Sequence, residues 1–246
     1  MNVKRLLLVA SVVLLCMTPA AWGAGAFVQV ANVQQTATTC AVTLNGTTAG
    51  NALVFVDNIN SVTLTDGTPS GGGTWTLGRG PDPVGTNQRS YSWVAPNIAG
   101  GNVTTTVTHS GSVFARCFLA EISGIATSSP IDGSGAANVS TSPMDSGPLT
   151  TTATDFIVGY GGNMIANDTF TAGTGFTIPT NGQAKGGGSA NFIEGKAGVA
   201  ADSPHTTATD SNTGPGNLMA GIALKESGGG PPPCANSIAL MGVGCR

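Results

Sequence analysis

Glutamate is rare in this sequence, and two glutamates stand out as residues that could do acid–base chemistry. Glu121 lies in the most apolar run of the chain, a setting that suits an acid catalyst, and Glu194 follows Phe192 in NFIEGK. Glycoside hydrolysis needs two carboxylates that flank one bond. Neither glutamate has a close carboxylate partner on its own predicted strand. We therefore expect Glu121 to be a structural carboxylate, bound by Arg116 or by backbone donors.

Histidine, the usual base of a nucleophilic triad, occurs only twice. His109 ends a predicted strand beside Ser110, and His205 lies near Asp202 and Asp210. The sequence contains no Gly-x-Ser-x-Gly turn of the kind that presents a nucleophilic serine. We expect both histidines to be solvated at strand ends, and we expect no catalytic site.

The sequence contains no specific metal-binding motif, only scattered residues of types that can bind a metal. Several acidic residues lie near predicted turns, where their oxygen atoms would suit calcium: Asp57, Asp66, Asp132, Asp145 and Asp168. No Asp-x-Asp-x-Asp loop is present, and aspartates in turns usually cap backbone groups. No Cys-x-x-Cys or His-x-x-x-His spacing occurs, so a zinc site is not expected. The sequence predicts no cofactor and leaves only a structural calcium ion open.

Sugar binding would need exposed aromatic faces beside amides or carboxylates. Aromatic residues make up only 5% of the chain. Trp75, in the glycine-rich segment GGGTWTLG, is the best candidate for an exposed platform. Tyr91 shares a face with Trp93, and each could equally belong to a core. The candidate ligand-binding residues are therefore Trp75, Tyr91, Glu121 and Glu194.

The elements that would position these residues are short β-strands. Apolar and polar residues alternate in many segments separated by Gly, Pro, Asn and Asp. The predicted strands cover residues 27–33, 39–44, 52–56, 61–65, 74–77, 89–95, 102–109, 112–123, 155–160, 170–178, 190–194, 205–209 and 218–225. This pattern predicts an all-β fold, a two-sheet antiparallel sandwich of jelly-roll or lectin-like type with about 10–13 short strands. Two tandem immunoglobulin-like domains, divided within residues 126–148, are the alternative.

Three segments carry a resemblance: SYSWVAPNIAGGNVTTTVT, FLAEISGIATSSPIDGSG and GPLTTTATDFIVGYG. An aromatic strand, a Thr/Val strand, an apolar strand ending in Glu-x-Ser-Gly and a Thr-Thr-x-x-x-Asp strand entry follow in order. This order resembles uncharacterised secreted bacterial Thr/Gly-rich β-sandwich domains. The resemblance covers most of residues 26–226, and it implies a fold and an exported location but no catalytic residues.

Both ends of the chain differ from its body. Lys4 and Arg5 precede a 12-residue apolar stretch and a small-residue cleavage site, so residues 1–23 are predicted to be a signal peptide. Residues 24–226 would form the sandwich and residues 227–233 a Gly/Pro linker. Residues 234–246 would form an apolar tail, closed by a disulfide between Cys234 and Cys245. The pairing of the other two cysteines of the exported chain is left open.

Composition limits the function. Only 9% of the residues are charged, the net charge is −3 and no basic cluster exists, which argues against nucleic-acid binding. No later apolar run is long enough to span a membrane. We expect a secreted or cell-surface protein that is a non-enzymatic structural, surface or adhesion module. The alternative is a lectin-like protein that binds or cleaves carbohydrate, and a glycan or a surface is the expected partner.

Overall fold

The computed structural model describes residues 23–84, 87–139, 142–212 and 216–228. Within these ranges the chain forms thirteen β-strands in three antiparallel sheets, which confirms the predicted all-β sandwich-like fold. No helix in the described part of the chain is long and apolar enough to cross a membrane.

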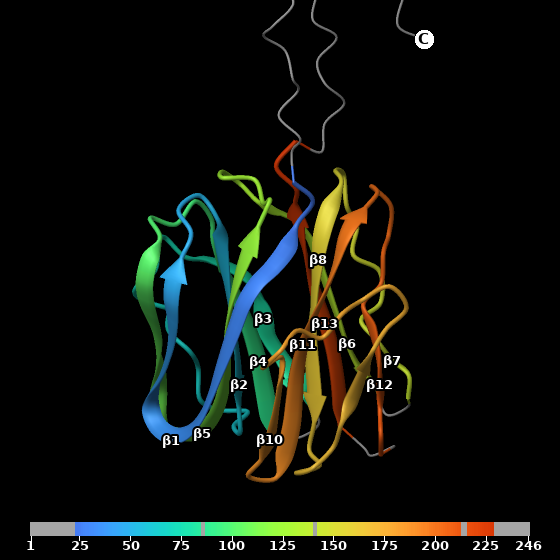
Figure 1. Ribbon diagram of the computed structural model, residues 1–246. Coiled ribbons are helices and arrows are strands. Elements are labelled where there is room, and N and C mark those ends of the chain that lie inside the picture. The colour runs from blue at the N-terminus through green and yellow to red at the C-terminus, as the bar shows by residue number, and fades with distance from the viewer. Residues whose placement is uncertain (1–22, 85–86, 140–141, 213–215, 229–246) are drawn as a thin grey trace, which may run out of the picture.

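Two large sheets divide the chain between them (Figure 1). The first sheet has the spatial order β1 (Ala26–Thr47), β5 (Gly101–Ser123), β2 (Ala52–Ile59), β4 (Gln88–Ala95) and β3 (Thr76–Val84). The second has the order β10 (Gln183–Gly186), β11 (Ser189–Val199), β8 (Asp155–Asn163), β13 (Asn217–Lys225) and β6 (Ile131–Val139). A small third sheet joins β7 (Met144–Asp145), β12 (Thr207–Asp210) and β9 (Phe170–Ala172). The chain therefore completes one large sheet before it begins the other.

One core joins the two large sheets. Val54 and Val56 of β2 and Phe118 of β5 pack against Tyr160 of β8 and Ile222 of β13. Because both halves of the chain contribute to this core, the described residues form one sandwich and not two tandem domains.

The paired strands β1 and β5 form a long ribbon that folds over the first sheet (Figure 1). The pairing slips between Ala37 and Thr39, where β5 has extra residues. Beyond the slip, Val42 and Val107 pack on Phe55, which lies on the outer face of β2. The sequence predicted two short strands in each of these segments. The structure has one long bent strand in each, because hydrogen-bonded pairing continues on both sides of the bend.

The outer face of the second sheet is also covered. Met144 and Phe170 of the third sheet pack against Phe192 of β11 and Met219 of β13. Strands β2 and β8 are consequently buried along their whole length. This double covering explains why the central strands are continuous apolar runs and do not alternate.

Residues 61–65 were predicted to be a strand but lie in the loop between β2 and β3. The side-chain oxygen of Ser61 accepts hydrogen bonds from the backbone N–H groups of Thr63 and Leu64. Such local bonds compete with strand pairing. The loop continues along the ribbon, where Ser70 forms a bridge with Thr106.

The two ends of the described chain meet at one end of the sandwich. The backbone N–H of Gly25 donates to the carboxylate of Glu226 at 2.9 Å, and the N–H of Ser227 donates to the carbonyl of Gly124 at 2.8 Å. The predicted signal peptide up to residue 22, the linker from residue 229 onward and the Cys234–Cys245 disulfide lie outside the described residues.

Candidate functional site

Three titratable side chains converge beneath the folded ribbon. Asp57 lies on β2 and Asp66 in the loop that follows it, while His109 lies in β5 at the bend of the ribbon. All three side chains are fully shielded from solvent. Nε2 of His109 lies 2.8 Å from Oδ2 of Asp57 and 3.9 Å from Oδ1 of Asp66.

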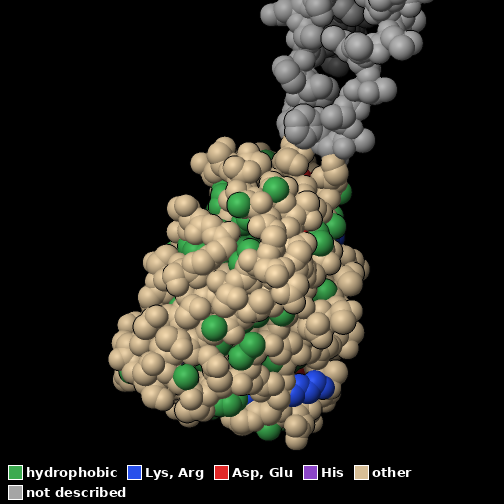
Figure 2. Space-filling view, turned by 60° about the vertical axis from the view of Figure 1, so that its left-hand side comes forward, with side chains coloured by type: hydrophobic (Ala, Val, Ile, Leu, Met, Phe, Trp, Pro, Cys, Tyr) green, Lys and Arg blue, Asp and Glu red, His purple; other side chains and the backbone are tan. Residues whose placement is uncertain are grey.

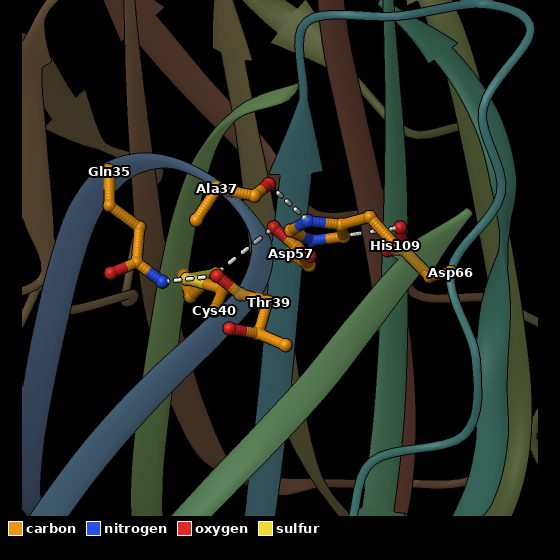
Figure 3. The surroundings of a disulfide bond; sticks show 8 residues. Gln35, Ala37, Thr39, Cys40, Asp57, Asp66 and His109 are labelled. Atoms are coloured by element: carbon orange, nitrogen blue, oxygen red, sulfur yellow. Dashed lines mark hydrogen bonds and ion pairs between the residues drawn. A yellow bond between two sulfur atoms is a disulfide. The ribbon is translucent and has the colours of Figure 1, made fainter. Parts of the chain in front are cut away.

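Figure 3 shows the imidazole of His109 between two acceptors. Its Nε2 faces Asp57, and its Nδ1 lies 3.3 Å from the carbonyl oxygen of Ala37 on β1. The cluster thereby links β1, β2, β5 and the loop that carries Asp66. Both carboxylate oxygens of Asp66 are buried without a hydrogen-bond donor among the described residues.

Burial dominates the electrostatics of the cluster. Burial, together with the neighbouring charge of Asp57, raises the pKa of Asp66 to about 9. Burial alone would lower the pKa of His109, but the hydrogen bond and charge of Asp57 outweigh it and leave that pKa raised. At neutral pH Asp66 therefore retains its proton.

A disulfide between Cys40 and Cys117 lies beside this cluster (Figure 3). It joins strands β1 and β5 across 77 positions of sequence. Sγ of Cys117 lies 3.1 Å from Oδ1 of Asp57. The sequence left this pairing open, since neither strand spacing nor proximity along the chain decided it.

The position of His109 corrects the expectation that it is solvated, because only 4% of the residue is exposed. The sequence did contain a signal for this burial. Val103, Thr105 and Val107 alternate along β5, and His109 continues the same buried face. On β2, Asp57 likewise continues the face of Phe55. Asp66 carries no comparable signal, because a loop residue has no periodicity to follow.

The cluster can hold a proton or a metal ion, but it is not a nucleophilic triad. Carboxylate and imidazole atoms of Asp57, Asp66 and His109 all lie within 4.8 Å of one another. No serine or threonine hydroxyl in the described residues is hydrogen bonded to the ring of His109. Because all three side chains are shielded from solvent, a substrate has no access to them in this structure.

The second histidine, His205, is exposed and pairs with Asp145 at 2.7 Å, not with Asp202 or Asp210. The two aromatic candidates are buried instead. Trp75 is 9% exposed and donates its indole N–H to the carbonyl of Gly71 at 2.7 Å. It does not form the exposed platform that the sequence suggested.

Tyr91 is 5% exposed and stacks on Trp93, with ring centroids 5.5 Å apart. It belongs to the core beneath the folded ribbon.

Glu121 is a fully buried structural carboxylate. It accepts hydrogen bonds from the backbone N–H of Thr48 at 2.7 Å, from Asn51 at 2.6 Å and from Gln29 at 2.7 Å. Backbone and amide donors therefore hold it, and Arg116 does not.

Glu194 is also buried, on β11. The backbone N–H of Gly173 donates to its Oε2 at 3.2 Å, while its Oε1 has no described donor. Burial raises the pKa of Glu194 to about 8. The side chain faces the outer cover of the second sheet with Phe192, whereas Glu121 faces the ribbon side of the first sheet with Leu119. Stacked sheets lie about 10 Å apart, so these carboxylates are too far apart for a glycosidase pair. A ligand-binding role for either glutamate stays a prediction.

A further buried polar group lies between the two large sheets. Arg116 of β5 donates to the hydroxyl of Ser189 on β11, and its guanidinium lies 4.5 Å from the ring centroid of Phe114. No described carboxylate pairs with it, and burial lowers its pKa to about 10. The amide atoms of Asn58 and Asn191 nearby also lack described partners.

An open cleft of about 960 Å³ lies at one end of the sandwich. It is lined by three connections, namely the end of the β2–β3 loop, the β4–β5 loop and the β5–β6 loop. Its lining residues are Gly72, Gly73, Thr74, Thr76, Pro96, Asn97, Ile98, Ala99, Gly100, Val103, Thr127, Ser129, Pro130 and Ile131. None of the four predicted ligand-binding residues is among them.

Two lining residues adopt the left-handed backbone conformation that side chains disfavour. Asn97 has φ 52° and Ser129 has φ 45°. The third such residue in the described chain, Asn181, lines a smaller groove of about 620 Å³ with Phe170 and Gln183. Backbone of this kind is strained and persists only where the surrounding structure holds it in place. It is found more often at binding surfaces than elsewhere.

Comparisons with protein-family models, with curated proteins and with solved structures found no match for this chain.

Proposed function

We propose that this chain is a non-enzymatic, exported surface or adhesion module that binds its partner in the cleft between the β2–β3, β4–β5 and β5–β6 loops. The observation that carries the proposal is the chemistry of the lining. No residue that lines this cleft has a titratable side chain. Acid–base and nucleophilic catalysis both need such a group within hydrogen-bond reach of the substrate.

The titratable groups that could serve a reaction are located elsewhere. Asp57, Asp66 and His109 are sealed beneath the ribbon, and Glu121 and Glu194 are buried on opposite sides of the sandwich. The cleft itself offers hydroxyl groups, one amide and backbone. These groups can recognise a ligand without transforming it.

The surface supports the same proposal. Figure 2 shows a face made mainly of uncharged polar side chains and backbone, with small scattered hydrophobic groups and few charges. A protein with 9% charged residues has little long-range electrostatic steering, so its contacts depend on shape and hydrogen bonding at short range. An export signal at residues 1–23 would place this surface outside the cytoplasm.

Carbohydrate is the ligand class that the lining favours. Thr74, Thr76, Asn97, Thr127 and Ser129 present hydroxyl and amide groups that can hydrogen bond to sugar hydroxyls. Cleavage of that carbohydrate is not proposed, because no carboxylate pair lies at the cleft.

The test measures binding and turnover on the same samples. The purified exported protein is incubated with insoluble cellulose, chitin and peptidoglycan and with washed cells of the producing strain. Ala99→Trp fills the cleft from an exposed lining position, and Ala201→Trp places the same side chain at an exposed position outside it.

We expect the native protein to bind at least one of these probes and to release no product. We expect Ala99→Trp to raise the Kd by about tenfold or more, which corresponds to a loss of about 1.4 kcal/mol in binding free energy. Ala201→Trp should bind as the native protein does. Release of soluble sugar, binding to none of the probes, or equal binding by both variants would overturn the proposal.

A further inference from the structure

The ligand atoms of Asp57, Asp66 and His109 form a compact set, and all three side chains are shielded from solvent. They come from β2, from the β2–β3 loop and from β5, and they all lie within 4.8 Å of one another. Asp66 contributes a fully shielded carboxylate whose two oxygens have no described donor. A buried carboxyl group whose oxygens lack partners is costly, so a hydrogen-bond donor or a cation is expected to face it.

The distances fit a small metal ion. Oxygen and nitrogen ligands about 2.0–2.2 Å from a tetrahedral zinc ion are about 3.3–3.6 Å from each other. Nε2 of His109 lies 2.8 Å from Oδ2 of Asp57 and 3.9 Å from Oδ1 of Asp66. These two separations lie on either side of the required value, so side-chain shifts of less than 1 Å would bring both to it and leave the fourth position of the ion for a further ligand.

The second nitrogen of His109 supports the same assignment. Histidines that bind a metal usually donate their other ring N–H to a carboxylate or a backbone carbonyl, which fixes the tautomer. Nδ1 of His109 faces the carbonyl oxygen of Ala37 at 3.3 Å, so Nε2 is left to point at the two carboxylates. A neutral imidazole in this tautomer presents its lone pair to the centre of the set.

We propose that Asp57, Asp66 and His109 bind one divalent transition-metal ion of the zinc class in a structural site. The imidazole nitrogen favours zinc over calcium, because calcium takes oxygen ligands. The ligands are 9 and 43 positions apart in sequence, which is why no short spacing motif indicated the site. The ion would attach the β2–β3 loop to the folded ribbon, where Asp66 already forms a bridge with His109.

The test uses the full exported chain, purified without chelators from zinc-supplemented medium, and counts bound metal by mass spectrometry. We expect about one zinc ion per chain, since a preformed structural site retains its ion. Protein from which a chelator has removed the metal should have a lower melting temperature. Added zinc should restore that temperature, and added calcium should not. Cobalt in place of zinc should give visible absorption bands from the ion in a protein site, which reports the ligands of the native chain directly.

Asp66→Asn is nearly isosteric and removes one ligand, and we expect it to weaken zinc binding by more than about tenfold. Asp145→Asn is the matched control, because Asp145 also pairs with a histidine, His205, but at an exposed position. It should bind zinc as the native chain does.

Less than about a tenth of an ion per chain with no cobalt bands would overturn the proposal. Equal affinity in Asp66→Asn would do the same, and calcium retained in place of zinc would overturn the assignment to the zinc class.

Discussion

Replacing Glu194 with Gln should remove a large pH dependence from the stability of the sandwich. Glu194 is completely shielded on β11, and its Oε1 packs against the backbone at Gly159 without a described donor. Only one backbone N–H, from Gly173, reaches the carboxylate. Burial therefore favours the protonated form and raises the pKa from 4.5 to about 8.

The direction and size of the effect follow from proton linkage. Between pH 4.5 and about 8 the folded state holds a proton on Glu194 that the unfolded state releases. The contribution of this group to stability is thus complete below pH 4.5, is lost as the pH rises through about 8, and does not change further above it. A shift of this size corresponds to at most about 5 kcal/mol, at about 1.4 kcal/mol per pH unit.

The assay is urea unfolding of the native protein and of Glu194→Gln at several pH values from 5 to 9. The amide mimics the neutral carboxyl and can still accept from Gly173, so the two proteins should be similar at pH 5. Burial also raises the pKa of Asp66 to about 9 and that of Asp155 to about 7. Both titrate in both proteins, so the difference in unfolding free energy isolates Glu194.

That difference should favour the variant increasingly with pH and reach several kcal/mol by pH 9. A difference that stays constant within about 1 kcal/mol across the range would refute the reasoning, since it would mean that Glu194 is ionised in the folded protein.

Three further changes test the interior. Replacing Cys40 and Cys117 together with Ala should lower the unfolding free energy by about 4–5 kcal/mol, because the bridge closes a loop of 77 positions; an unchanged urea midpoint would contradict its structural role. Glu121→Gln should cost about 1–3 kcal/mol, because the new amide N–H faces one of the donors that now bind the carboxylate; calorimetry that shows no loss would count against that network. Arg116→Met should keep or raise the melting temperature, because it replaces an unpaired buried charge with an apolar side chain of similar volume; a drop of many degrees would show that the bond to Ser189 outweighs the cost of burial.

The fold was largely predictable from the sequence because its signals are local. Period-2 patterning identifies most strands, and Cys40, Val42 and Leu44, which alternate along one of them, all lie in one buried cluster. The largely apolar segments at β2 and β8 are typical of strands that are covered on both faces, as the structure has them.

The bent ribbon was not predictable from the same signals. A slip in pairing between Ala37 and Thr39 leaves the alternation on each side intact, so one long strand looks like two short ones. The order of strands depends on contacts between distant segments, which periodicity does not encode.

The buried cluster was only partly within reach. His109 and Asp57 each lie two positions after a buried residue of the same strand face. Their place in this alternation predicts that both are buried. Their contact, and the arrival of Asp66 from a loop, depend on how β5 folds over β2. Trp75 was misjudged because glycine-rich surroundings suggest exposure, whereas here the glycines allow the loop to pack closely: a Cβ at Gly72 would lie 2.8 Å from Leu53 and Val103.

Hydrogen–deuterium exchange on the bound protein tests most directly whether the cleft is the contact surface. The native protein is compared free and bound to whichever polysaccharide or cell-wall probe retains it. We predict slower exchange in residues 72–76, 97–100 and 127–131, which line the cleft from three separate connections. Protection confined to residues 170–172 and 178–183, which line the smaller groove, or spread evenly over the sandwich, would contradict the account.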